Sequence, residues 1–231
     1  MMATTLRLSL TNFDSNENLS LYEELLSEEI MWLFNRKYPL EVLFIPYAYD
    51  GGFYNTYIQK VRTIFGKFGI QVKLLTAGNP GDLINAASAI IVGGGSLSKL
   101  LAGTVNHFDI LRYKIQKGTP YLGWNEGSVL VSPYYVIPPL MPVSSTCLGV
   151  IPKQIYCHYQ DTSQNRVEIN NFFVNHANDE VPVTEVICLK NRPGGSGIRL
   201  EDDGAGLLLN VIPGSDPPTI FVYQNGTMNV L

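Results

Sequence analysis

The chain has 231 residues, 45% of them hydrophobic and 16% charged, and a net charge of −4. This apolar content is enough for a sizeable core and excludes a solvated, disordered chain, so we expect a single domain over residues 1–231. No block of Lys and Arg occurs that would supply the counterion release on which phosphate binding depends. Nucleic acid is therefore excluded as an expected partner.

The cysteines and the first residues bear on the compartment. The three cysteines, Cys147, Cys157 and Cys188, form no CxxC pair, and their odd number leaves one over in any disulfide scheme. We expect buried thiols in a reducing compartment. The first residues lack a basic segment followed by a long apolar run, and no segment approaches the ~20 apolar residues of a membrane span. We therefore expect a cytoplasmic protein with no membrane partner.

Strand and helix patterns alternate from the start of the chain. Short apolar runs predict strands, and apolar residues that recur every three or four positions predict helices. In chain order the predicted elements are a strand over residues 6–10, a helix over 21–34, a strand over 41–47, a helix over 54–69 and a strand over 70–75. This order is typical of βαβ units.

Two further units follow the same pattern. The apolar run 89–92 leads into Gly93, Gly94 and Gly95, helical material fills 96–118, and the run 119–124 ends in a second glycine-rich stretch. Strands buried on both faces and joined by helices predict a three-layer α/β sandwich with a mostly parallel central sheet. Ligands in such folds bind at the carboxyl ends of the strands, where both glycine-rich stretches fall.

Beyond about residue 130 the pattern loosens. The proline-rich stretch 132–145 is expected to be loop or edge strand, and 166–180 is expected to be one helix. Runs of β-branched and apolar residues predict strands over 185–190, 204–212 and 219–231. The last of these runs contains Gln224-Asn225-Gly226, which indicates a hairpin turn.

Residues 121–127, YLGWNEG, have the shape of a nucleophile elbow, in which two glycines let a sharp turn after a strand present one side chain. The reactive position holds Asn125, whose amide is not a usable nucleophile at neutral pH. The run VGGG lacks the spacing of a nucleotide-binding loop, and no His or Cys cluster has the spacing of metal ligands. We expect neither a cofactor nor a metal.

Four segments carry a resemblance to a known family. They read VLFIPYA at 42–48, AIIVGGGSLSKLL at 89–101, TPYLGWNEGSVLVSP at 119–133 and QIYCHYQ at 154–160. In order, spacing and flanking residues this succession resembles peptidase E, the aspartyl dipeptidase of serine peptidase family S51. The resemblance implies an α/β sandwich related to class I glutamine amidotransferases, which agrees with the periodicity.

The resemblance also implies roles for single residues. In the family the elbow serine attacks the peptide carbonyl, a histidine takes its proton, and backbone N–H groups of the glycine loop and of the residue after the serine hold the oxyanion. Asn125 stands at the serine position and Glu126 at the following alanine, while His158 matches the histidine. The loop is kept as Gly93–Gly95, followed by Ser96 where the family has Asn.

The third member of the triad has no evident counterpart. The family places an acidic residue shortly before a Met-Pro dipeptide and upstream of the histidine, but no Asp or Glu occurs between Glu126 and Asp161. Without such a carboxylate an imidazole loses control of tautomer and orientation, which is worth about 10⁴ in the rate of serine proteases. Two of the three triad roles are therefore expected to be vacant.

Three functions are compatible with these residues. The leading hypothesis is a non-catalytic pseudopeptidase that binds a peptide or small acyl ligand in a pocket lined by Gly93–Ser96, Asn125, Glu126 and His158; a homodimer is compatible with the aromatic content. The alternative is a hydrolase in which Glu126 and His158 activate water. A third hypothesis, a dipeptidase with a displaced nucleophile, requires a Ser or Cys within about 3 Å of His158.

Each candidate also has a structural interpretation. Asn125 tolerates the positive φ of a sharp turn. Glu126 would be a solvated surface charge or an acid beside the elbow that contacts a cationic group, and His158 would be a pocket histidine without acid–base duty. Cys157 is rejected as a nucleophile because neighbours on a strand point to opposite faces. The segment 190–204 is interpreted either as a hairpin loop or as a basic lip of the pocket that offers Arg192.

Overall fold

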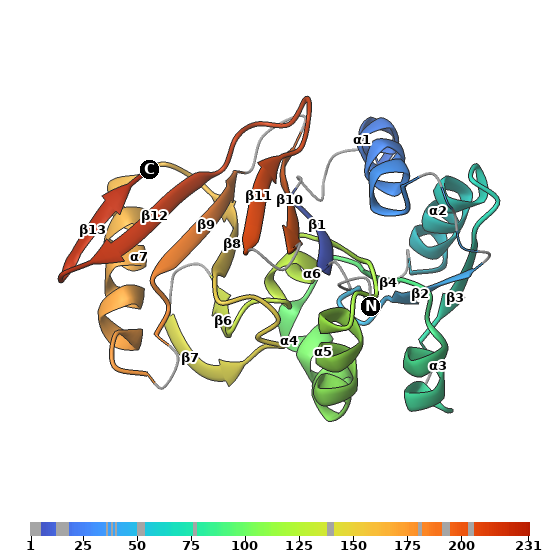
Figure 1. Ribbon diagram of the computed structural model, residues 1–231, viewed down its shortest axis with the longest axis horizontal. Helices are drawn as coiled ribbons and strands as arrows, with labels where there is room; N and C mark the ends of the chain where they lie inside the picture. The colour runs from blue at the N-terminus through green and yellow to red at the C-terminus, as the bar shows by residue number, and fades with distance from the viewer. Residues whose placement is uncertain are drawn as a thin grey trace.

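The computed structural model describes residues 6–12, 19–35, 37, 39, 41–49, 54–75, 78–137, 141–179, 182–190, 195–202 and 206–231. Figure 1 shows a central sheet with helices on both sides and a second, smaller sheet beside it. In the part of the chain that is described, no helix is both long enough and apolar enough to cross a membrane.

The central sheet has seven strands in the order β11-β10-β1-β5-β4-β2-β3. Its parallel strands are β1 (Leu6–Asn12), β5 (Tyr121–Trp124), β4 (Ile90–Val92), β2 (Glu41–Ile45) and β3 (Gln71–Leu74). Two more strands, β10 (Ser196–Asp202) and β11 (Leu207–Val211), extend the sheet beyond β1, and β10 is antiparallel to both of its neighbours. The predicted α/β fold with a mostly parallel sheet is confirmed.

Helices cover both faces because alternate residues of each strand point to opposite sides. In β2, Val42 and Phe44 pack with α1 (Leu19–Leu33) and α2 (Tyr54–Gly66). Leu43 and Ile45 join the opposite core. The elements on that side are α3 (Pro80–Ala86), α4 (Leu97–Thr104), η1 (Val105–His107) and α5 (Phe108–Gln116).

The smaller sheet extends the core on the side away from α1 and α2 (Figure 1). Its order is β13-β12-β9-β8, from β8 (Gln154–Tyr159), β9 (Glu185–Lys190), β12 (Thr219–Gln224) and β13 (Thr227–Val230). Ile155 and Cys157 of β8 face the main core, whereas Tyr156 and Tyr159 pack in the cluster under α7 (Ser163–His176). The smaller sheet thereby links α7 to the main core.

Two expectations about loops have clear outcomes. Gln224 pairs with Thr227 across the predicted hairpin turn, where Asn225 and Gly226 have φ of 52° and 78°, as a tight two-residue turn requires. The stretch 132–145, expected to be loop or edge strand, contains the antiparallel pair β6 (Tyr134–Ile137) and β7 (Met141–Thr146).

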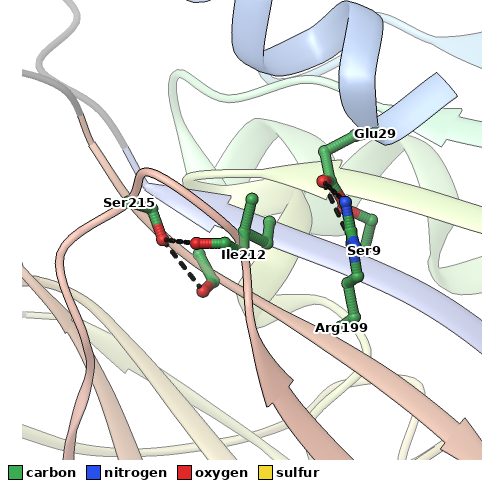
Figure 2. A network of polar contacts seen from close by, with 6 residues as sticks. Ser9, Glu29, Arg199, Ile212 and Ser215 are labelled. Atoms are coloured by element: carbon green, nitrogen blue, oxygen red, sulfur yellow. Dashed lines mark hydrogen bonds and ion pairs between the residues drawn. The ribbon is translucent and has the colours of Figure 1, made fainter. Parts of the chain in front are cut away.

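The hairpin-loop interpretation of 190–204 is wrong for its described part, because 196–202 forms β10 beside β1. Arg199 of β10 does not line a basic lip; it forms an ion pair with the fully buried carboxylate of Glu29 on α1 (Figure 2). The strand was missed because a charged residue occupies a largely buried position and is neutralised from a distant helix. Arg192, the cation that the basic lip was expected to offer, lies outside the described residues.

Candidate functional site

The glycine loop and the elbow meet because β4 and β5 are parallel neighbours. Val92 is in register with Gly123, so the residues that follow each strand emerge at the same edge of the sheet. A Cβ atom on Gly94 would lie only 2.7 Å from Cβ of Asn125. Glycine is therefore required for the loop to lie this close to the turn.

Asn125 occupies a sharp strand-to-helix turn. Its φ and ψ are 52° and −116°, its side chain is buried, and its backbone N–H donates to the carbonyl oxygen of Thr11 over 2.8 Å. The short helix α6 (Glu126–Val129) begins at the next residue and packs so closely that a Cβ on Gly127 would lie 2.3 Å from the carbonyl oxygen of Val92. The sharp strand-to-helix turn expected for a nucleophile elbow is present, and Asn125 stands at its central position.

The Glu126 side chain turns toward the glycine loop. Its Oε2 accepts a hydrogen bond of 2.5 Å from the backbone N–H of Gly95. The side chain is only 18% exposed, so the interpretation of Glu126 as a solvated surface charge is wrong. A carboxylate of the protein thus engages an N–H group of the loop that, in the resembled family, holds the oxyanion.

His158 faces the same carboxylate from the smaller sheet. Its Nε2 lies 3.7 Å from Oε1 of Glu126, a distance within the range of an ion pair but too long for a hydrogen bond. The pairing of β8 with β9 shifts register between Tyr156 and Tyr159, and His158 has a φ of 59°. This irregularity sets His158 apart from the regular alternation of β8.

Asn12, which the sequence analysis missed, anchors that irregularity. Its Oδ1 accepts the backbone N–H of His158 over 3.3 Å, and its Nδ2 donates to the carbonyl oxygen of Lys190 over 2.9 Å. Asn12 thereby joins the end of β1 to β8 and β9. The available signal was a polar residue at the carboxyl end of a buried strand, where ligand sites of parallel sheets lie.

Tyr57 is a second residue that the sequence analysis did not select, since it fits the apolar face of a helix. Its hydroxyl accepts from Nε1 of Trp124 over 2.8 Å, and a Cβ on Gly93 would lie 2.3 Å from it. Burial, and then the charge of Glu126, raise the pKa of Tyr57 above its usual range. The glycine loop thus packs against a neutral phenol.

The serines near the site have structural partners. Ser96 caps α4 by accepting from the backbone N–H of Lys99. Ser128 is buried and donates to the carbonyl oxygens of Thr11 and Gly123, while Ser132 accepts from the backbone N–H of Ile155. No Ser, Thr or Cys side chain among the described residues forms a hydrogen bond with the His158 imidazole.

Cys157 lies near the elbow but is unsuited to attack. Its thiol donates to the carbonyl oxygen of Asn125 over 3.2 Å. Burial raises its pKa well above the usual range, and the nearby charge of Glu126 adds to the shift. The nucleophilic thiolate is therefore suppressed. All three cysteines are free and buried, as expected, and no metal-binding cluster occurs among the described side chains.

Comparison with known sequences gives a family. The profile of Peptidase family S51 matches residues 14–205. A peptidase E of Nostoc sp. is 28% identical over 204 residues, which cover 80% of this chain and 76% of that protein. A peptidase E of Shewanella amazonensis is 33% identical over 127 residues, which cover 52% of this chain and 54% of that protein.

Comparison with solved structures agrees in fold. A peptidase from an acI-B1 Actinobacterium matches with a TM-score of 0.67 and 15% identity, over 100% of this chain and 96% of that chain. A putative peptidase E of Listeria monocytogenes matches with a TM-score of 0.57 and 16% identity, over 90% of this chain and 98% of that chain. The family profile matches most of the chain, and the chain belongs to peptidase family S51.

Proposed function

We propose that this member of the family is a non-catalytic pseudopeptidase that binds a peptide or small acyl ligand in its former active site. The site comprises Gly93–Ser96, Asn125, Glu126 and His158. One observation carries the proposal: Oε2 of Glu126 accepts the backbone N–H of Gly95 over 2.5 Å, directly after a turn whose reactive position holds an amide.

Acyl transfer needs a nucleophile and a donor for the oxyanion, and Asn125 and Glu126 affect one requirement each. An amide at position 125 offers no electron pair for attack on a peptide carbonyl, so a covalent acyl intermediate cannot form there. The resemblance assigns the oxyanion to N–H groups of the glycine loop, and one of these, the N–H of Gly95, already donates to a carboxylate. Like charges repel each other, so the Glu126 carboxylate opposes the oxyanion that the glycine loop would otherwise stabilise.

The test is hydrolysis of a library of Asp-X dipeptides and amides by the wild type, by Asn125→Ser and by Asn125→Ser/Glu126→Ala. We expect the wild type to be inert and Asn125→Ser to be weakly active at most. The double variant should exceed Asn125→Ser, because it frees the Gly95 N–H. Turnover by the wild type would refute the proposal.

A matched control uses Asn125→Ser/Glu41→Ala. Glu41 is an exposed carboxylate at the amino end of β2, the edge of the sheet opposite the site. This variant changes the net charge as the double variant does. It should therefore behave like Asn125→Ser alone; a gain equal to that of the Glu126 double variant would mean that the Gly95 contact has no part in the effect.

A second function is favoured by the 3.7 Å between Oε1 of Glu126 and Nε2 of His158. In that case the chain is a hydrolase of altered mechanism, in which the carboxylate and the imidazole share the activation of a water molecule that attacks a peptide or amide. Its signature is turnover by the wild type that Glu126→Ala abolishes. The same library therefore separates the two functions.

A further inference from the structure

We infer that the site recognises a primary ammonium group and that Glu126 is the residue that determines this specificity. The inference rests on the proposed function and deepens it, because it names the group that the bound peptide presents, namely its free amino terminus. An anionic ligand is disfavoured at this site. The Gly95 N–H is engaged by a carboxylate, so an anionic ligand would have to displace a negative charge of the protein.

The Glu126 carboxylate is largely shielded from solvent, since its side chain is only 18% exposed. Among the described residues no Lys or Arg forms an ion pair with Glu126. Its carboxylate accepts the Gly95 N–H and lies 3.7 Å from Nε2 of His158. A largely desolvated carboxylate without a cationic partner favours a ligand that brings one.

The gap between Glu126 and His158 has the width for one nitrogen atom. Oε1 of Glu126 and Nε2 of His158 are 3.7 Å apart, so a single nitrogen can lie about 2.9 Å from both of them. A primary ammonium carries three N–H donors, so it can donate to the carboxylate oxygen and, when Nε2 carries no proton, to the imidazole as well. The His158 side chain is 33% exposed, so a ligand can approach the gap from solvent.

The experiment compares three peptides that differ in charge at their ends. They are alanyl-alanine amide, which is cationic, N-acetyl-alanyl-alanine amide, which is neutral, and N-acetyl-alanyl-alanine, which is anionic. Calorimetric titration at neutral pH measures each Kd, and the shift of the Gly95 amide resonance locates the peptide. We expect the cationic peptide to bind at least about ten-fold more tightly than the neutral one, and the anionic one to bind most weakly.

Two variants and one control sharpen the result. Glu126→Gln should weaken the cationic peptide at least about ten-fold, because the carbonyl oxygen of glutamine keeps the Gly95 contact but lacks the charge. Glu126→Ala should improve binding of the anionic peptide, since it exposes the Gly95 N–H. Glu41→Gln, which removes a charge at the opposite edge of the sheet, should leave all three affinities unchanged.

The outcomes separate this inference from the function on which it rests. Equal affinities of the free and acetylated amides, or an unchanged Kd in Glu126→Gln, contradict recognition of an ammonium and leave the pocket proposal standing. Failure of all three peptides to bind at millimolar concentration contradicts both.

Discussion

Glu29 and Glu126 are both shielded carboxylates, but their oxygens have very different partners. Glu29 is fully buried, accepts a hydrogen bond of 2.5 Å from Ser9, and receives Nε and Nη2 of Arg199 at 3.1 and 2.7 Å (Figure 2). The guanidinium also lies over the ring of Trp32, 4.9 Å from its centroid. Every charge in this cluster has a partner of opposite sign or a donor.

Only one oxygen of Glu126 accepts a hydrogen bond from the described residues. Oε2 accepts the Gly95 N–H, whereas Oε1 lies 3.7 Å from Nε2 of His158. The Glu29 cluster joins α1 to the central sheet, and the Glu126 cluster lies at the carboxyl edge of the parallel strands, where a ligand can reach it. The structural carboxylate Glu29 is therefore fully paired, whereas the carboxylate of the candidate site has one oxygen without a hydrogen-bond donor among the described residues.

The strongest way to test this contrast is to remove the charge of Glu29. Glu29→Gln leaves the largely buried Arg199 without its counter-ion, because Arg199 is only 16% exposed. We expect the free energy of unfolding to fall by about 3 kcal/mol, as measured by chemical denaturation.

Glu201→Gln is the matched control for that variant. Glu201 lies on the same strand as Arg199 and pairs with Arg7 at 3.0 Å, but the two side chains are 25% and 30% exposed. Such a pair is worth about 0–1 kcal/mol. A loss as large as that of Glu29→Gln would mean that burial does not distinguish the two pairs.

Asp179 is a third carboxylate; it is more exposed than Glu29 and Glu126, and we expect it to affect the stability of the fold only at acid pH. It accepts from the Tyr134 hydroxyl at 2.5 Å and lies 2.6 Å from Nδ1 of His176 at the end of α7. The Tyr134 hydrogen bond, followed by that of His176, lowers the pKa of Asp179 below its usual 3.8. A lowered pKa stabilises the fold above the unfolded value, and this contribution is lost as pH falls through the folded value.

We therefore expect the stability of the wild type to fall below about pH 4, with part of that fall absent in Asp179→Asn. Denaturation curves of both proteins across this range measure the difference. A variant whose stability depends on pH as steeply as that of the wild type would show that Asp179 does not carry the effect. Because Asp179 is 34% exposed, the difference should be smaller than the loss in Glu29→Gln.

The fold could be predicted where the sequence carries strong periodic patterns. The run 42–45 is continuously apolar because its residues pack alternately into two cores, so the buried parallel strand was evident. β10 escaped prediction for a physical reason. Arg199 places a charge at a largely buried position between Ile198 and Leu200, and its counter-ion, Glu29, lies 170 residues earlier in the chain.

The candidate site shows the same limit. Family spacing predicted that the glycine loop, the elbow and His158 lie together, and the adjacency of β4 and β5 brings the first two into contact. The direction of a single side chain does not follow from spacing. Glu126 turns back to the Gly95 N–H, and Asn12 holds the irregular strand at His158, through contacts that form only once distant segments have packed.

The smallest expected effect completes the comparison of the two glutamates. Glu126→Gln should lower the free energy of unfolding by less than about 1 kcal/mol, because the glutamine carbonyl oxygen can still accept the Gly95 N–H and no described guanidinium or ammonium group loses a partner. Chemical denaturation beside Glu29→Gln measures this directly. A loss near 3 kcal/mol would make Glu126 a structural carboxylate like Glu29. A small loss together with a changed affinity for the amino-terminal peptides would mean that its charge is kept for a ligand, since the fold does not need it.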